Sequence, residues 1–67
     1  SVAVLRKDAR EQVFAYVERE YVKGFSLDQI GDQFLKMAKA YRSPAPFVDE
    51  AQKVLVQLGW KPKRERA

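Results

Sequence analysis

Apolar side chains recur at helical spacing through residues 26–60 of this chain. In the first half of that stretch they share one face within about 100° of each other, and polar side chains occupy the opposite face. Ser26 and Gln29, three residues apart at its start, form the pattern of a capping box, and Phe25 is placed to pack on Ile30 as a hydrophobic staple. We therefore expect a helix over residues 27–41. Its apolar face consists of Leu27, Ile30, Phe34, Met37, Ala38 and Tyr41.

Two prolines follow this run and separate it from a second one. Pro44 and Pro46 end the preceding helix, because a residue that precedes proline is pushed out of the α region. Pro46 itself suits the first helical position, where its missing N–H has no partner to lose. Gly59 is typical of a helix stop, and Trp60 is expected to fold back over the core. The pattern predicts a helix over residues 46–58, with an apolar stripe of Phe47, Ala51, Val54, Leu55 and Leu58.

The beginning of the chain gives a weaker pattern. Asp8 and Glu11 have the spacing of another capping box, and Gly24 is a stop signal, so we expect a helix over residues 8–23. Val2 and Val4 alternate before it, which favours a short N-terminal strand, although the next residue could equally begin a helix. The expected apolar face consists of Ala9, Val13, Phe14, Tyr16, Val17 and Tyr21.

Together these elements predict an all-α fold, a compact three-helix domain over residues 1–60. Residues 26–60 resemble a helix-turn-helix in a generic way, although their loop is longer than the usual turn of about 3–4 residues. A winged-helix variant is the second alternative, with residues 2–5 pairing with residues 60–63 as strands. At 67 residues the chain forms one domain, and a domain of this size buries only about 60% of its unfolded surface.

The composition removes several classes of chemistry. The chain has neither Cys nor His, which excludes a structural zinc site and Cys–His or Ser–His catalytic pairs. The carboxylate pairs Asp28–Asp32 and Asp49–Glu50 could hold Mg²⁺ through water, but on exposed helices we interpret them as solvated surface charge. We therefore expect no catalytic residues, no metal, no cofactor and no enzymatic activity.

No apolar run approaches the roughly 20 residues of a membrane span, so no membrane partner is expected. The first five residues are too short for a signal peptide, whose apolar region has about 7–15 residues. With the lack of Cys, this favours an intracellular location over a secreted one. The chain begins with Ser, which is consistent with a processed product or a fragment of a larger protein.

Charge is distributed unevenly along the chain. The net charge is +4, from 13 basic and 9 acidic residues. Residues 61–67 hold four of those basic residues and one acidic residue, a net of +3. Residues 1–60 therefore hold nine basic and eight acidic residues, a net of +1. The pattern predicts a nearly neutral folded body followed by a flexible basic tail.

The first functional hypothesis is a small accessory module that binds nucleic acid, DNA in preference to RNA. The third predicted helix would enter the major groove, where Gln52 could read adenine and Lys53 could contact guanine or phosphate. Basic residues at the end of the second helix and in the tail would contact the phosphate backbone. The expected phosphate contacts are Lys36, Lys39, Arg42, Lys61, Lys63, Arg64 and Arg66.

The second hypothesis is a regulatory module that docks on a partner protein or forms a homodimer. Val22 and Val56 point away from the main apolar stripes of their helices, and Val48 lies at the edge of its stripe. Single exposed apolar residues are normal, whereas a cluster of them would mark a partner surface. In this alternative the basic tail would steer the encounter.

Overall fold

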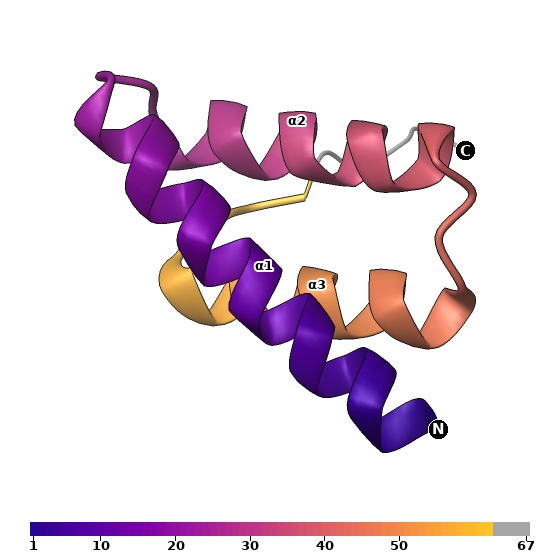
Figure 1. Cartoon of the computed structure of the whole chain (residues 1–67). Coiled ribbons are helices and arrows are strands. Elements are labelled where there is room, and N and C mark those ends of the chain that lie inside the picture. The colour runs from indigo at the N-terminus through magenta and orange to yellow at the C-terminus, as the bar shows by residue number, and fades with distance from the viewer. Residues whose placement is uncertain (63–67) are drawn as a thin grey trace.

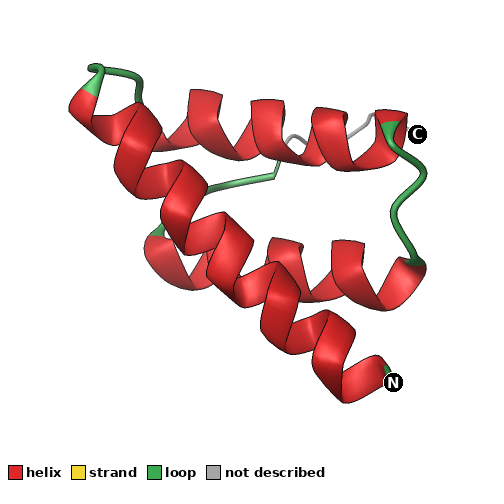
Figure 2. Cartoon of the chain, in the orientation of Figure 1, coloured by secondary structure: helices red, strands yellow, loops and turns green. Residues whose placement is uncertain are grey.

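The chain folds into three helices and no strand over residues 1–62, the part that the structure, a computed structural model, describes (Figure 2). Helix α1 spans Val2–Val22, α2 spans Leu27–Ala40 and α3 spans Ala45–Leu58. The predicted all-α, three-helix fold is therefore confirmed. Lys63, Arg64 and Arg66 of the predicted tail lie outside the described residues.

Helices α2 and α3 lie side by side and run antiparallel, and α1 crosses both of them on one side (Figure 1). After α3, residues 59–62 turn back and pass α2 on the side away from α1. Helices α2 and α3 therefore have α1 on one face and residues 59–62 on the other. The expected helix-turn-helix-like character of residues 26–60 is not confirmed by this arrangement.

Helix α1 begins six residues earlier than the sequence pattern predicted. Ser1 is its N-cap, and the Ser1 hydroxyl accepts a hydrogen bond from the Val4 N–H at 3.3 Å. Asp8 is an exposed residue inside the helix and not its cap. The expected N-terminal strand is also wrong, because Val2 and Val4 are helical. The first turns contain good helix formers and are tied to α3 by Arg6, so the helix extends past the capping pattern at Asp8.

The N-terminus of α2 has the predicted capping box. The Gln29 N–H donates to the Ser26 hydroxyl at 3.2 Å, and the Ser26 N–H donates to the Gln29 side-chain oxygen at 3.0 Å. Helix α3 begins at Ala45, so Pro46 occupies its second position and not the first. This shift of one residue leaves the proline within the first turn, where no backbone donor is lost.

All three helices end in the same backbone motif. One or two residues after each helix a residue has a positive φ, and the N–H of the following residue bonds back to a carbonyl five residues earlier, which is a Schellman motif. The positive φ angles belong to Gly24 at 101°, Gly59 at 110° and Arg42 at 55°. The closing bonds run from Phe25 to Glu20, from Ser43 to Ala38 and from Trp60 to Leu55. Gly24 and Gly59 confirm the predicted stops, whereas the Arg42 stop has no glycine signal.

The core lies where the three helices meet. Its buried members are Val13, Phe34, Ala51, Val54, Leu55 and Trp60. Tyr16 packs edge-on against Phe34 with ring centroids 5.4 Å apart. Tyr21 and Tyr41, expected on the apolar faces, are 67% and 80% exposed. Tyr21 lies in the last turn of α1, and Tyr41 is the C-cap residue of α2.

One buried carboxylate links the first and third helices. Glu50 of α3 accepts a hydrogen bond from Arg6 of α1 at 3.3 Å, and Arg10 lies 3.6 Å from its other oxygen. Only 11% of the Glu50 side chain is exposed. The interpretation of Asp49 and Glu50 as a solvated pair is therefore wrong for Glu50, because α1 covers it, while Asp49 is exposed.

Candidate nucleic-acid interface

The segment after α3, residues 59–62, is held against α2, and we call it the C-terminal strap. Trp60 is 4% exposed, which confirms that it folds back over the core. Its indole N–H donates to Asp32 at 3.1 Å, and the Lys61 backbone N–H donates to Asp28 at 3.3 Å. The interpretation of Asp28 and Asp32 as purely solvated charge is therefore wrong, because both carboxylates bind the strap.

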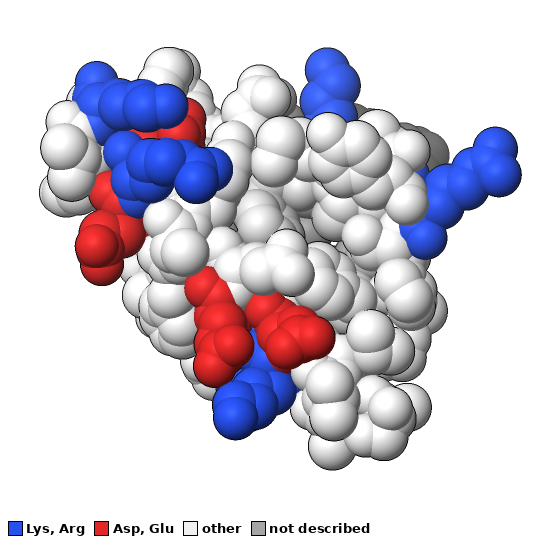
Figure 3. All heavy atoms as spheres, in the orientation of Figure 1, with Lys and Arg blue, Asp and Glu red and all other residues white. Residues whose placement is uncertain are grey.

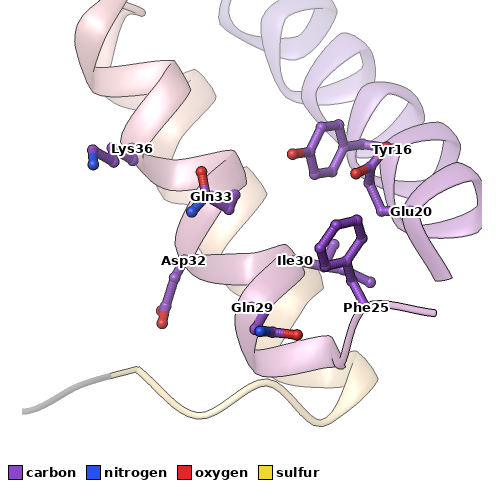
Figure 4. A pocket seen from close by; sticks show the side chains of 8 residues that line it. All are labelled: Tyr16, Glu20, Phe25, Gln29, Ile30, Asp32, Gln33 and Lys36. Carbon is purple, nitrogen blue, oxygen red and sulfur yellow. The ribbon is translucent and has the colours of Figure 1, made fainter. Parts of the chain in front are cut away.

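Gly31 makes the close approach of the strap possible. A Cβ atom at this position would clash with the Trp60 indole ring. Any larger residue would therefore push Trp60 away from α2. Figure 4 shows Asp32, the next residue, pointing away from α1 toward the C-terminal segment, and Lys36 one turn further along α2 also points away from α1.

A hollow beside the C-terminal strap is lined by several of the residues predicted to bind nucleic acid. Lys36 and Lys39 come from α2, Gln52 comes from α3, and the strap closes the hollow. We call it the basic hollow. It is lined by Asp32, Leu35, Lys36, Lys39, Gln52, Trp60 and Pro62. The fold thus brings Lys36 and Pro62, which are 26 positions apart along the chain, to the same hollow.

The remaining predicted contacts lie at different distances from the basic hollow. Lys53 lines a neighbouring hollow that shares Gln52 with it. Lys61 is exposed in the strap itself. Arg42 is exposed just past the end of α2, outside the lining of either hollow. The structure therefore groups the second-helix lysines, Gln52 and the start of the tail, with Lys53 adjoining them.

Sequence reasoning missed Arg6 as a neighbour of this region. It lines the neighbouring hollow together with Asp49, Gln52, Lys53, Val56 and Gln57. Arg6 reaches this place because Glu50 holds it from 44 positions away in the sequence. Spacing along the chain carries no signal for such a contact, so only the packing of α1 on α3 reveals it.

The face that α1 covers has a different charge pattern. Figure 3 shows basic side chains at its upper left and right edges, acidic and basic side chains together at its lower centre, and a broad uncharged area between these groups. A hollow opens between the middle of α1, the end of α2 and the start of α3, and each of its lining residues is uncharged. They are Gln12, Phe34, Met37, Ala38, Tyr41, Ser43 and Phe47, and we call this place the uncharged hollow.

A further hollow lies between the end of α1 and the start of α2 (Figure 4). Tyr16, Phe25 and Ile30 give it an apolar floor, and Glu20 lies at its rim beside Tyr16. The Lys23 ammonium donates to Glu20 at 3.0 Å, and this hydrogen bond, reinforced by Arg19, holds the pKa of the Glu20 carboxyl below its ordinary value. Glu20 therefore stays ionised at neutral pH.

The three valines predicted as a partner surface lie at three places on two helices. Val22 is 83% exposed near the end of α1, and Val56 is 49% exposed near the end of α3. Val48 is half-buried in the first turns of α3, at the other end of that helix from Val56. The larger exposed apolar side chains of the uncharged hollow, Met37 and Tyr41, were instead assigned to the core by the sequence pattern.

Within residues 1–62, no group of three or more acidic side chains is arranged to hold a metal ion. Over the same residues, no helix is both long enough and apolar enough to cross a membrane. Comparisons with protein-family models, with curated proteins and with solved structures found no match to this chain.

Proposed function

We propose that this chain is a non-enzymatic module that binds the backbone of nucleic acid, DNA in preference to RNA, across the face formed by α2, α3 and the C-terminal strap. One observation carries the proposal. Lys36, Lys39 and Gln52 line the same hollow as Pro62, the point from which the basic tail continues. Lysine ammonium groups grouped in this way neutralise adjacent phosphates and release their counterions.

The preference for duplex DNA is supported by the kind of side chains on this face. Gln52 and Lys53 are exposed on a helix, and the major groove of B-DNA admits a helix whereas that of A-form RNA is too narrow. Binding of single strands uses exposed aromatic side chains on which bases stack. The aromatic residue in the basic hollow, Trp60, is buried, so this face suits phosphate contacts better than base stacking.

The decisive experiment is a titration of random-sequence duplex DNA at several salt concentrations, read by fluorescence anisotropy. We expect the double variant Lys36→Gln/Lys39→Gln to bind more weakly and to lower the slope of log K against log salt by about 0.9 for each lost phosphate contact. The control Lys7→Gln/Lys23→Gln removes the same charge from exposed positions of α1 and its end. It should change the slope much less.

Two results would count against the proposal. If the unaltered chain does not bind DNA at low salt, where attraction is strongest, the nucleic-acid function fails. If both double variants weaken binding equally, the effect comes from overall charge and the basic hollow is not the site.

Docking on a partner protein is the alternative function, and the uncharged hollow is the observation that favours it. Tyr41 at its rim is 80% exposed, and an exposed apolar patch is a common mark of a protein interface. In this case DNA binding would be absent, and sedimentation would show self-association or binding of one partner. Tyr41→Ala should abolish that association, whereas Tyr21→Ala, which also removes a largely exposed tyrosine, should leave it intact.

A further inference from the structure

The strap is attached to the same stripe of α2 that carries the two lysines of the basic hollow. Asp28, Asp32, Lys36 and Lys39 follow one another at intervals of four, four and three residues, so they lie along one side of the helix. The two carboxylates come first and bind the strap, at Lys61 and Trp60 respectively. The two lysines follow and line the hollow that Pro62 also lines.

We propose that Asp28 and Asp32 are positioning residues, which dock the C-terminal strap on α2 so that Pro62, the last described residue, lies beside Lys36 and Lys39 and the basic sequence after it begins there. This inference rests on the proposed nucleic-acid function. It adds how the lysines of α2 and the basic residues that follow α3 in the sequence act on the same ligand. Without the strap, the tail would be tethered only at the end of α3. With it, the point where the tail leaves the fold is fixed next to the basic hollow.

Several contacts support a fixed attachment. Gly59 adopts the left-handed conformation that turns the chain back, and the Trp60 N–H closes the turn on Leu55 at 2.9 Å. Gly31 leaves room for the indole ring, and Asp32 satisfies the indole N–H. A preorganised arrangement of cations loses less conformational freedom on binding than two independent segments do.

The direction of the change in DNA affinity distinguishes a positioning role of Asp28 and Asp32 from a purely electrostatic one. Replacing Asp28 and Asp32 by Ala removes two negative charges beside the basic hollow, which by Coulomb attraction alone should tighten the binding of DNA. Release of the strap should instead weaken binding, because the tail then acts at a lower effective concentration. If removal of a carboxylate weakens the binding of a polyanion, that carboxylate does not act by repelling the polyanion.

The experiment compares Asp28→Ala/Asp32→Ala with Asp8→Ala/Glu18→Ala in the full chain, with random-sequence duplex DNA as the probe. The control removes two exposed carboxylates of α1, away from the strap. We expect the strap variant to bind about threefold or more weakly, with a smaller salt slope, and the control to bind as tightly as the unaltered chain or more tightly. Trp60, the sole tryptophan, should emit at longer wavelength in the strap variant.

The outcomes distinguish the inference from the function on which it rests. If the unaltered chain binds DNA and the strap variant binds as tightly as the control, the positioning role is overturned and the proposed function stands. If the unaltered chain does not bind, both fail. If circular dichroism shows that the strap variant is unfolded, Trp60→Phe decides, since it keeps an aromatic ring and all charges but removes the donor to Asp32. It should weaken binding in the same direction, and unchanged affinity would overturn the inference.

Discussion

At the scale of single residues, the backbone at Gly31 and at Arg42 is under constraints that the residue type alone does not indicate. Gly31 lies inside α2, where glycine is destabilising by roughly 0.5–1 kcal/mol relative to alanine. Its place is explained by Trp60, whose ring occupies the space of the missing Cβ. Arg42 adopts a φ of 55°, a left-handed conformation that is strained for a residue with a Cβ.

We expect Gly31→Ala to destabilise the fold by about 1–3 kcal/mol, because the added methyl group overpacks the contact with Trp60. The measurement is denaturant unfolding followed by circular dichroism. In a Trp60→Ala background the same change should become neutral or stabilising, since the space is then open and alanine favours the helix. An equal loss in both backgrounds would show that the two residues are not in contact.

Arg42→Gly should stabilise the protein relative to Arg42→Ala by about 1 kcal/mol, since glycine adopts the left-handed conformation without a Cβ clash. The alanine variant is the control, because it removes the same side chain and keeps the strain. Thermal unfolding of the two variants gives the difference. A glycine variant that melts below the alanine variant would contradict the Schellman geometry at the end of α2.

At the scale of elements, the helices are joined by a few polar contacts in addition to the core. Glu50 connects α3 to α1 through Arg6 and Arg10, and the strap connects the end of α3 to α2. At the end of α1, Arg19 and Lys23 both contact Glu20, and the Arg19 guanidinium also lies 5.3 Å from the centre of the Tyr16 ring. This last cluster predicts a dependence of stability on pH.

The Glu20 carboxyl has an ordinary pKa of 4.5, and the hydrogen bond from Lys23 lowers its pKa in the folded chain. The ionised form is therefore favoured by folding, so its contribution is complete above pH 4.5 and is lost as the pH falls through the lower, folded pKa. We expect Glu20→Gln to reduce the acid sensitivity of the melting temperature below pH 4.5. Glu18→Gln, on an exposed position of the same helix, is the control and should leave most of that sensitivity in place.

At the scale of the whole molecule, the core is small and each of its members contributes a large share. Leu55 is fully buried at the centre of the three helices, whereas Leu58, three residues later on α3, is 40% exposed. Such a chain has only about 5 kcal/mol of stability to lose.

Leu55→Ala should cost about 2–5 kcal/mol, from lost burial and the cavity left behind, and so largely unfold the protein. Leu58→Ala is the matched control on the same helix and should cost about 1 kcal/mol or less, because much of its side chain already contacts water. Denaturant titration of both variants measures the difference. Sharp and similar transitions for the two would show that α3 is rotated relative to the orientation described.

The local features of the fold were predictable because they depend on neighbouring residues. The capping box at Ser26 and Gln29, the stops at Gly24 and Gly59 and the apolar stripes of α2 and α3 each involve positions within one or two turns of a helix. The start of α1 was missed by the same local reasoning, because the capping pattern at Asp8 lies inside the helix and Ser1 is the residue that caps it.

The sequence by itself thus determined three helices, most of their ends and a nearly neutral body with a basic tail. The tertiary structure decided the placement of the candidate site, because its contacts join residues that are far apart in the chain. Glu50 binds Arg6 across 44 positions, and Asp28 and Asp32 bind Lys61 and Trp60 across 33 and 28 positions. A hydrogen bond depends on the distance between two atoms in space, and helical periodicity fixes that distance only within a single helix.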